Sequence, residues 1–278
     1  MKISQIGGAL ALAGLLATAP AYSGNIVLTG HDNDFHRSTQ ANAATAAELA
    51  FVRNGNILPV LTFDAGTQLT SQLTSLGITF TNVDPTLAGN VTDALFNASL
   101  YSAFVVASVS TCGGCDNPVG TGSILATHFG AITAFFNAGR GILAFAGATD
   151  LAAYSFVPSA ATNAGGSPPS SGYVQTAAGI LLGLPAVNGD PTHNFFSEPG
   201  TAGLSAAYVV TERLGNALTG TPETIALRGG TIVCPPGTVP SGGTCTISTG
   251  TVPEPSSLAL IALALGGLLG FSKRRRNT

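Results

Sequence analysis

The stretch of the sequence with the most capacity for chemistry is TGHDNDFH, residues 29–36, which places two histidines and two aspartates within eight residues. Only 8% of the chain is charged, and it holds four histidines in all. Neutral imidazole and carboxylate together are ligands for zinc, manganese or iron, and they are also common acid–base groups of enzymes. The candidate catalytic residues are therefore His31, Asp32, Asp34 and His36, and the candidate metal ligands are His31, Asp34 and His36.

The same stretch can also be explained without any chemistry. It matches neither the HExxH pattern of zinc proteases nor the longer frame of a calcium-binding EF-hand. Asp32, Asn33 and Asp34 favour turns through hydrogen bonds from side chain to backbone, and Asp34 could cap a short turn. A structural loop, a loop that binds a ligand or divalent metal, and a catalytic loop all stay open.

Alternating strands and helices must position this stretch. Strands are predicted in residues 25–30, 56–64, 78–84, 101–110 and 141–147, and helices in residues 38–53, 67–76, 91–99 and 122–139. Strands that are apolar throughout indicate a parallel sheet covered on both faces. We therefore predict an α/β fold with a doubly wound, mostly parallel, flavodoxin-like sheet. A short helix in 173–183 and late antiparallel strands in 206–214 and 223–230 complete it.

Ligands of a doubly wound sheet lie outside the carboxyl ends of its strands, so polar loops at that edge form a candidate ligand rim. The loops that follow the predicted strands contribute four further rim residues, namely Asp64, Asp116, Asp150 and His193. His128 falls inside the helix predicted for 122–139 and is expected to be a packed or surface histidine. Glu212 and Arg213 are adjacent on a late strand, and we expect them to form a local ion pair.

The four cysteines fall into two local pairs, Cys112 with Cys115 and Cys234 with Cys245. In an exported chain an even number of cysteines indicates disulfides, and local pairing is the most economical of the three connectivities. The CGGC segment could instead be a redox or zinc motif. No second CxxC supplies zinc ligands, and a loop rather than a helix follows, so structural disulfides are the prediction.

The composition between the two ends excludes one class of partner. Residues 24–252 hold five arginines, no lysine and twelve acidic residues, a net charge of 5 − 12 = −7. Nucleic acid is held by lysine and arginine, so we expect no nucleic-acid partner. An acidic, lysine-free body suits a protein that must stay soluble outside the cell.

Both ends of the chain carry targeting features. Residues 1–23 have a basic start, an apolar core and a small-x-small cleavage site, the layout of a secretory signal peptide. The C-terminal end has three parts in order, namely Pro253-Glu254-Pro255, an apolar stretch over 258–271 and a basic cluster over 273–276. With its flanking residues included, the apolar stretch is about as long as the shortest membrane-spanning helices. The basic cluster would stay in the cytoplasm.

The C-terminal layout closely resembles the PEP-CTERM sorting signal of bacteria. The resemblance implies that an exosortase, a membrane-embedded cysteine peptidase, recognises the tail and cuts it near Pro253, Glu254 and Pro255. It further implies export across the inner membrane by the secretion machinery and a transient membrane anchor. Release or attachment to the cell surface or the extracellular, exopolysaccharide-containing matrix would follow. The alternative is an ordinary C-terminal membrane anchor.

The body resembles the class I glutamine amidotransferase-like fold, and within it the trehalose-utilisation branch. The resemblance rests on a strand ending in TG before the acidic, histidine-containing loop, on FVVAS, and on FNAGRGILAFAG. Where such enzymes carry the G-x-C-x-G nucleophile elbow, this sequence reads STCGGCDN. The catalytic triad of that family is therefore not carried over, and G-x-S-x-G is also missing from the body.

These features divide the chain into a signal peptide (1–23), an amidotransferase-like domain (24–230), a disulfide-closed loop and linker (231–252) and a sorting signal (253–276). The first hypothesis is an exported surface or matrix protein with a non-catalytic domain. The alternative is an extracellular, metal-assisted hydrolase or carbohydrate-modifying enzyme that uses the His31–His36 loop.

Overall fold

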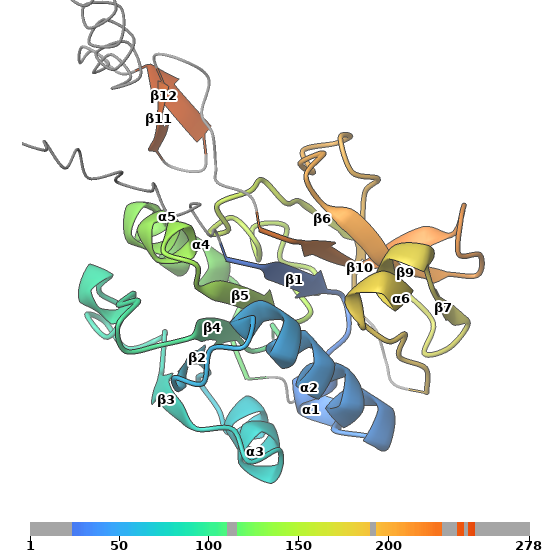
Figure 1. Ribbon diagram of the computed structural model, residues 1–278, viewed down its shortest axis with the longest axis horizontal. Helices are drawn as coiled ribbons and strands as arrows, with labels where there is room; N and C mark the ends of the chain where they lie inside the picture. Colours follow the sequence, from blue (N-terminus) through green and yellow to red (C-terminus); the bar gives the residue numbers. More distant parts are fainter. Residues whose placement is uncertain (1–23, 110–115, 190–192, 230–237, 242–243, 248–278) are drawn as a thin grey trace, which may run out of the picture.

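A mixed eight-stranded sheet forms the centre of the molecule (Figure 1). The computed structural model describes residues 24–109, 116–189, 193–229, 238–241 and 244–247. The strand order is β3-β2-β4-β5-β1-β10-β9-β7. The parallel half holds β1 (Ile26–Thr29), β2 (Val60–Phe63), β3 (Phe80–Val83), β4 (Ala103–Val106) and β5 (Gly141–Ala144). The predicted α/β class with a mostly parallel sheet is confirmed.

The other half of the sheet is antiparallel and comes from the last third of the domain. β1 pairs antiparallel with β10 (Thr221–Leu227), which pairs with β9 (Val209–Leu214), and β7 (Tyr173–Gln175) closes the edge. The predicted late antiparallel strands are thus confirmed. Two small two-stranded sheets stand apart from the main sheet, β6 (Asn163–Gly165) with β8 (Phe195–Phe196) and β11 (Thr238–Ser241) with β12 (Thr244–Ile247).

Helices cover both faces of the sheet and bury a separate hydrophobic cluster on each (Figure 1). Successive residues of a strand point to opposite faces, so Val27 packs with α2 and α3, whereas Ile26 and Leu28 pack with α4 and α5. The helices are α1 (Asn33–His36), α2 (Thr39–Arg53), α3 (Gln68–Ser75), the 3-10 turn η1 (Asp93–Leu95), α4 (Thr121–Ala126), α5 (Phe129–Asn137) and α6 (Ala177–Leu182).

Three predicted helices differ from the structure. The helix expected over 91–99 is only the 3-10 turn η1. The helix expected over 122–139 is broken between α4 and α5, where the Thr127 hydroxyl donates to the Ile124 carbonyl and competes with the backbone ladder. The segment 173–183 begins as strand β7 and becomes helical only after Thr176, whose hydroxyl accepts from the Gly179 amide and so caps α6.

Several predictions fall outside the residues that the structure describes. These are the signal peptide, the tail from Pro253 onward, Cys112, Cys115 and Cys234, and the side chain of Cys245. Among the described residues, no helix has both the length and the apolar character that crossing a membrane requires.

Candidate functional site

The chain after β1 makes a single helical turn, α1, that brings Asp32 and His36 to the same face. The Asp32 carbonyl accepts from the amides of Phe35 (2.9 Å) and His36 (3.3 Å). Residues four apart on a helix are neighbours on its surface. Arg37, with φ of 49°, ends the turn in the left-handed region. Because β1, β2, β4 and β5 are parallel, this turn lies at the same sheet edge as the loops that follow the other three strands.

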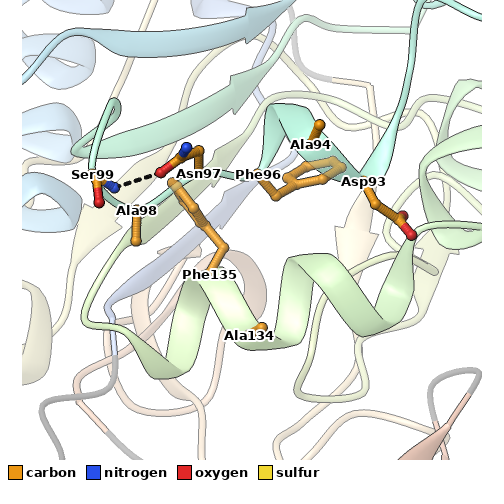
Figure 2. A pocket seen from close by; sticks show the side chains of 8 residues that line it. All are labelled: Asp93, Ala94, Phe96, Asn97, Ala98, Ser99, Ala134 and Phe135. Atoms are coloured by element: carbon orange, nitrogen blue, oxygen red, sulfur yellow. Dashed lines mark hydrogen bonds between the residues drawn. The ribbon is translucent and has the colours of Figure 1, made fainter.

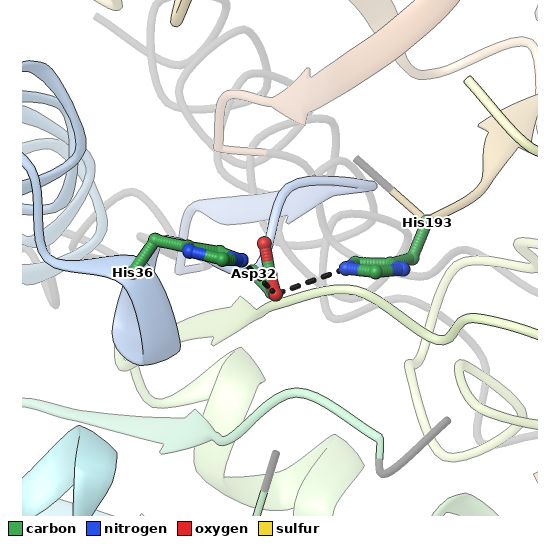
Figure 3. A group of neighbouring side chains, drawn as sticks. All are labelled: Asp32, His36 and His193. Atoms are coloured by element: carbon green, nitrogen blue, oxygen red, sulfur yellow. Dashed lines mark hydrogen bonds and ion pairs between the residues drawn. The ribbon is translucent and has the colours of Figure 1, made fainter. Parts of the chain in front are cut away.

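Asp32 lies between two imidazoles (Figure 3). One oxygen of its carboxylate, Oδ2, is 3.3 Å from Nε2 of His36 and 3.0 Å from Nε2 of His193. The Asp32 side chain is fully buried, whereas those of His36 and His193 are 29% and 21% exposed. The hydrogen bond to Asp32 raises the pKa of His193, which burial opposes. We call Asp32, His36 and His193 the Asp32 cluster.

His193 is held in place from two sides although it lies 161 residues from Asp32 in the chain. Its backbone amide donates to the Gly30 carbonyl at 2.9 Å. The next residue, Asn194, is buried, and its Oδ1 accepts from the backbone amide of Gly147 (2.7 Å) at the end of β5. The Asp32 cluster therefore joins the loops that follow β1 and β5 with the segment that precedes β8.

His31 points away from this cluster toward the antiparallel half of the sheet. Its Nε2 lies 2.9 Å from Oε2 of Glu212, and both side chains are buried. The same Glu212 oxygen accepts from the Thr224 hydroxyl at 2.6 Å, and Oε1 accepts from the Val187 amide at 2.6 Å. The expected local pair of Glu212 with Arg213 is wrong, because adjacent strand residues face opposite sides of the sheet.

Arg213 instead forms an ion pair with Glu198, which lowers the pKa of that carboxyl. Glu198 comes from the loop after β8, on the opposite side of the strand from Glu212. The arginine also donates to the Gly220 carbonyl at 2.6 Å. This contact belongs to the turn between β9 and β10 and lies apart from the candidate rim.

Asp34 binds the loop after β4. Its Oδ2 accepts from the Ser108 amide (2.8 Å) and the Ser108 hydroxyl (3.0 Å), whereas the buried Oδ1 has no hydrogen-bond partner among the residues that the structure describes. Burial raises the pKa of Asp34 to about 7 against these hydrogen bonds, and the charge of Asp32 adds to the rise. Of the three predicted metal ligands, only His36 lies in the Asp32 cluster, while His31 and Asp34 bind other partners.

The remaining rim aspartates mainly bind backbone amides. Asp64 accepts from Gly66 (2.8 Å) and Thr70 (3.1 Å), and Asp116 accepts from Gln68, all around the start of α3. Burial, followed by a hydrogen bond with Asp116, raises the pKa of Asp64 to about 7. Asp150 accepts from Gly120 and Ala152, each at 2.9 Å. These contacts are those of caps and turns.

Sequence reasoning missed two buried acids beneath the rim. Burial raises the pKa of Glu48 to about 8 and the pKa of Glu223 well above its usual value. In both cases the charge of Glu212 is the second cause of the rise. A signal for Glu48 was available, because it lies four residues from Ala44 and from Val52 on the buried face of α2. For Glu223 no local signal exists.

A hollow of about 390 Å³ lies elsewhere, between η1 and α5 (Figure 2). Among the residues that line it, the charged one, Asp93, is paired with His128 at 2.7 Å, and Phe96 and Phe135 are its aromatic residues. The His128 side chain is 20% exposed and packs against this region, in line with the expected packed or surface histidine. The charged group that lines the hollow is thus already paired.

Comparison with known proteins identifies one end of the chain. Residues 251–276 match the family model of the PEP-CTERM protein-sorting motif. Neither the search of curated proteins nor the search of solved structures found a match. The chain therefore carries a PEP-CTERM motif, which marks an exported protein that is anchored transiently in the membrane and sorted by an exosortase.

Proposed function

We propose that this is a surface or extracellular-matrix protein whose α/β domain is a non-catalytic member of the amidotransferase-like fold. The observation that carries the proposal is the PEP-CTERM match over residues 251–276. Cleavage near Pro253-Glu254-Pro255 would free the acidic body, net charge −7, from its basic and apolar tail. The freed domain is retained at the surface or in the exopolysaccharide matrix, or released.

One feature supports a domain without nucleophilic catalysis. STCGGCDN after β4 does not match the nucleophile elbow, and α4 begins only at Thr121.

The sorting half of the proposal is tested in the native host with Glu254→Ala. The expected result is a larger precursor that stays with the membrane fraction, and less processed protein at the surface or in the medium. Ser257→Ala, three residues along in the same tail, is the matched control and should be processed normally. Normal processing of the Glu254→Ala chain would refute exosortase sorting through this motif.

The non-catalytic half is tested separately on the full chain. Incubation with glutamine should release no ammonia above the buffer rate, and the processed protein should sediment with matrix polysaccharide isolated from the host. Ammonia release that disappears in Cys112→Ala or Cys115→Ala would show a working amidotransferase site and overturn the proposal.

A second candidate function, a metal-assisted hydrolase or carbohydrate-modifying enzyme, is favoured by the Asp32 cluster alone. Its donor set of two imidazoles and one carboxylate occurs in catalytic zinc sites. Whether this candidate survives depends first on whether the cluster holds a metal.

A further inference from the structure

We propose that Asp32, His36 and His193 form a binding site for one divalent transition-metal ion of the zinc class. The three residues come from two distant parts of the chain, and their ligand atoms all lie within 4.8 Å of one another. This set shares only His36 with the ligands expected from the sequence. The inference does not depend on how the protein is sorted.

The spacing of the ligand atoms fits a metal ion. Zinc binds imidazole nitrogen and carboxylate oxygen at about 2.0–2.2 Å, so two ligands lie about 3.3 Å apart around a tetrahedral ion and about 3.0 Å apart around an octahedral one. The Asp32 oxygen is 3.3 Å from the His36 nitrogen and 3.0 Å from the His193 nitrogen. The third distance, between the two imidazole nitrogens, is at most 4.8 Å, and rotation of the partly exposed His36 imidazole would shorten it.

The ligand atoms, two nitrogens and one oxygen, determine which class of metal ion the cluster can bind. Calcium and magnesium are bound through oxygen ligands, and two imidazoles with a single carboxylate are a poor match for either ion. Two imidazole nitrogens and one carboxylate oxygen suit zinc, iron(II), cobalt and their neighbours in the first transition row. Zinc is the reference ion here because it needs no particular redox environment outside the cell.

The three residues of the Asp32 cluster are already positioned by the fold without a bound metal. Asp32 and His36 are fixed by one helical turn, and the Gly30 carbonyl holds the backbone of His193. The Asp32 side chain is fully buried, whereas both imidazoles are partly exposed, so solvent reaches the cluster from the side of the imidazoles. Three protein ligands with an open, solvent-facing position is the arrangement of zinc sites that bind water or a substrate.

The charge around Asp32 favours a cation. The fully buried carboxylate of Asp32 faces the imidazoles of His36 and His193. Without a metal, both imidazoles must carry a proton on Nε2 to bind the same oxygen. A metal ion replaces these two protons and neutralises the buried carboxylate.

The test is a metal titration of the untagged full chain after chelator treatment. Isothermal titration with Zn²⁺, and absorption spectra with Co²⁺, should show one ion per chain. His36→Ala and His193→Ala should weaken binding at least tenfold. His128→Ala is the matched control, because it removes another partly exposed histidine paired with an aspartate, and it should bind like the wild type.

Two results would overturn the proposal. The first is a wild-type chain that binds neither Zn²⁺ nor Co²⁺ at a one-to-one ratio. The second is a His36→Ala chain whose affinity equals that of His128→Ala. His36 is partly exposed on a short turn, so its replacement leaves the fold intact and decides the question even where His193→Ala does not fold.

Discussion

Glu48 is expected to make the stability of this domain fall as the pH rises. It is 3% exposed on α2, and within the described part of the chain Oε2 of its carboxyl has no hydrogen-bond partner. Burial raises its pKa from 4.5 to about 8, and the nearby charge of Glu212 adds to the rise. The folded state thus holds a proton that the unfolded state loses. Its contribution is complete below pH 4.5 and is lost as the pH rises through about 8.

The size of the effect follows from the shift. At about 1.4 kcal/mol per pKa unit, the folded state loses about 3 kcal/mol between pH 4.5 and 7 and about 5 kcal/mol by pH 9. Glu48→Gln keeps the shape of the side chain and cannot ionise, so it should match the wild type near pH 4.5 and be more stable by a few kcal/mol at pH 8.

The assay is urea unfolding of both chains at pH 5 and pH 8, with the free energy of unfolding compared at each pH. Glu198→Gln is the matched control. Its partly exposed carboxylate is paired with Arg213, which lowers its pKa below 4.5, so its contribution is lost only below that pH and the replacement should cost nearly the same at pH 5 and pH 8. An unchanged difference between Glu48→Gln and wild type at the two pH values would refute the buried-proton argument.

Two further predictions concern packing around the rim. Gly30→Ala should lower the free energy of unfolding by about 2 kcal/mol or more, because the new Cβ would lie 1.9 Å from the Asn194 carbonyl oxygen. Gly130→Ala is the control, because Gly130 has open space around it on α5. In thermal melts of both variants, Gly130→Ala should be neutral or slightly stabilising. His31→Ala should cost about 1–3 kcal/mol or more, because it removes the hydrogen bond between the buried imidazole and Oε2 of Glu212. A loss below about 0.5 kcal/mol in urea unfolding would contradict a stabilising buried hydrogen bond.

Part of the candidate site could be predicted from the sequence and part could not. The step of four residues from Asp32 to His36 is a local signal, since a single helical turn brings such residues together. His193 was expected at the rim, but its contact with Asp32 depends on the Gly30 carbonyl and the Asn194 side chain, which no local pattern shows. The partner of His31 was missed, because Glu212 becomes its neighbour only when β10 pairs with both β1 and β9.

The sequence by itself determined the sorting motif, the acidic charge of the body and the alternation of buried strands with helices. Each of these depends on residue order, composition or periodicity within a short window. Only the tertiary structure decided that Asp32 faces two imidazoles, that Glu212 takes His31 rather than Arg213, and that Glu48 and Glu223 lie buried beneath the rim. The physical reason is that contacts between residues far apart in the chain are set by strand order and packing, to which every strand of the sheet contributes.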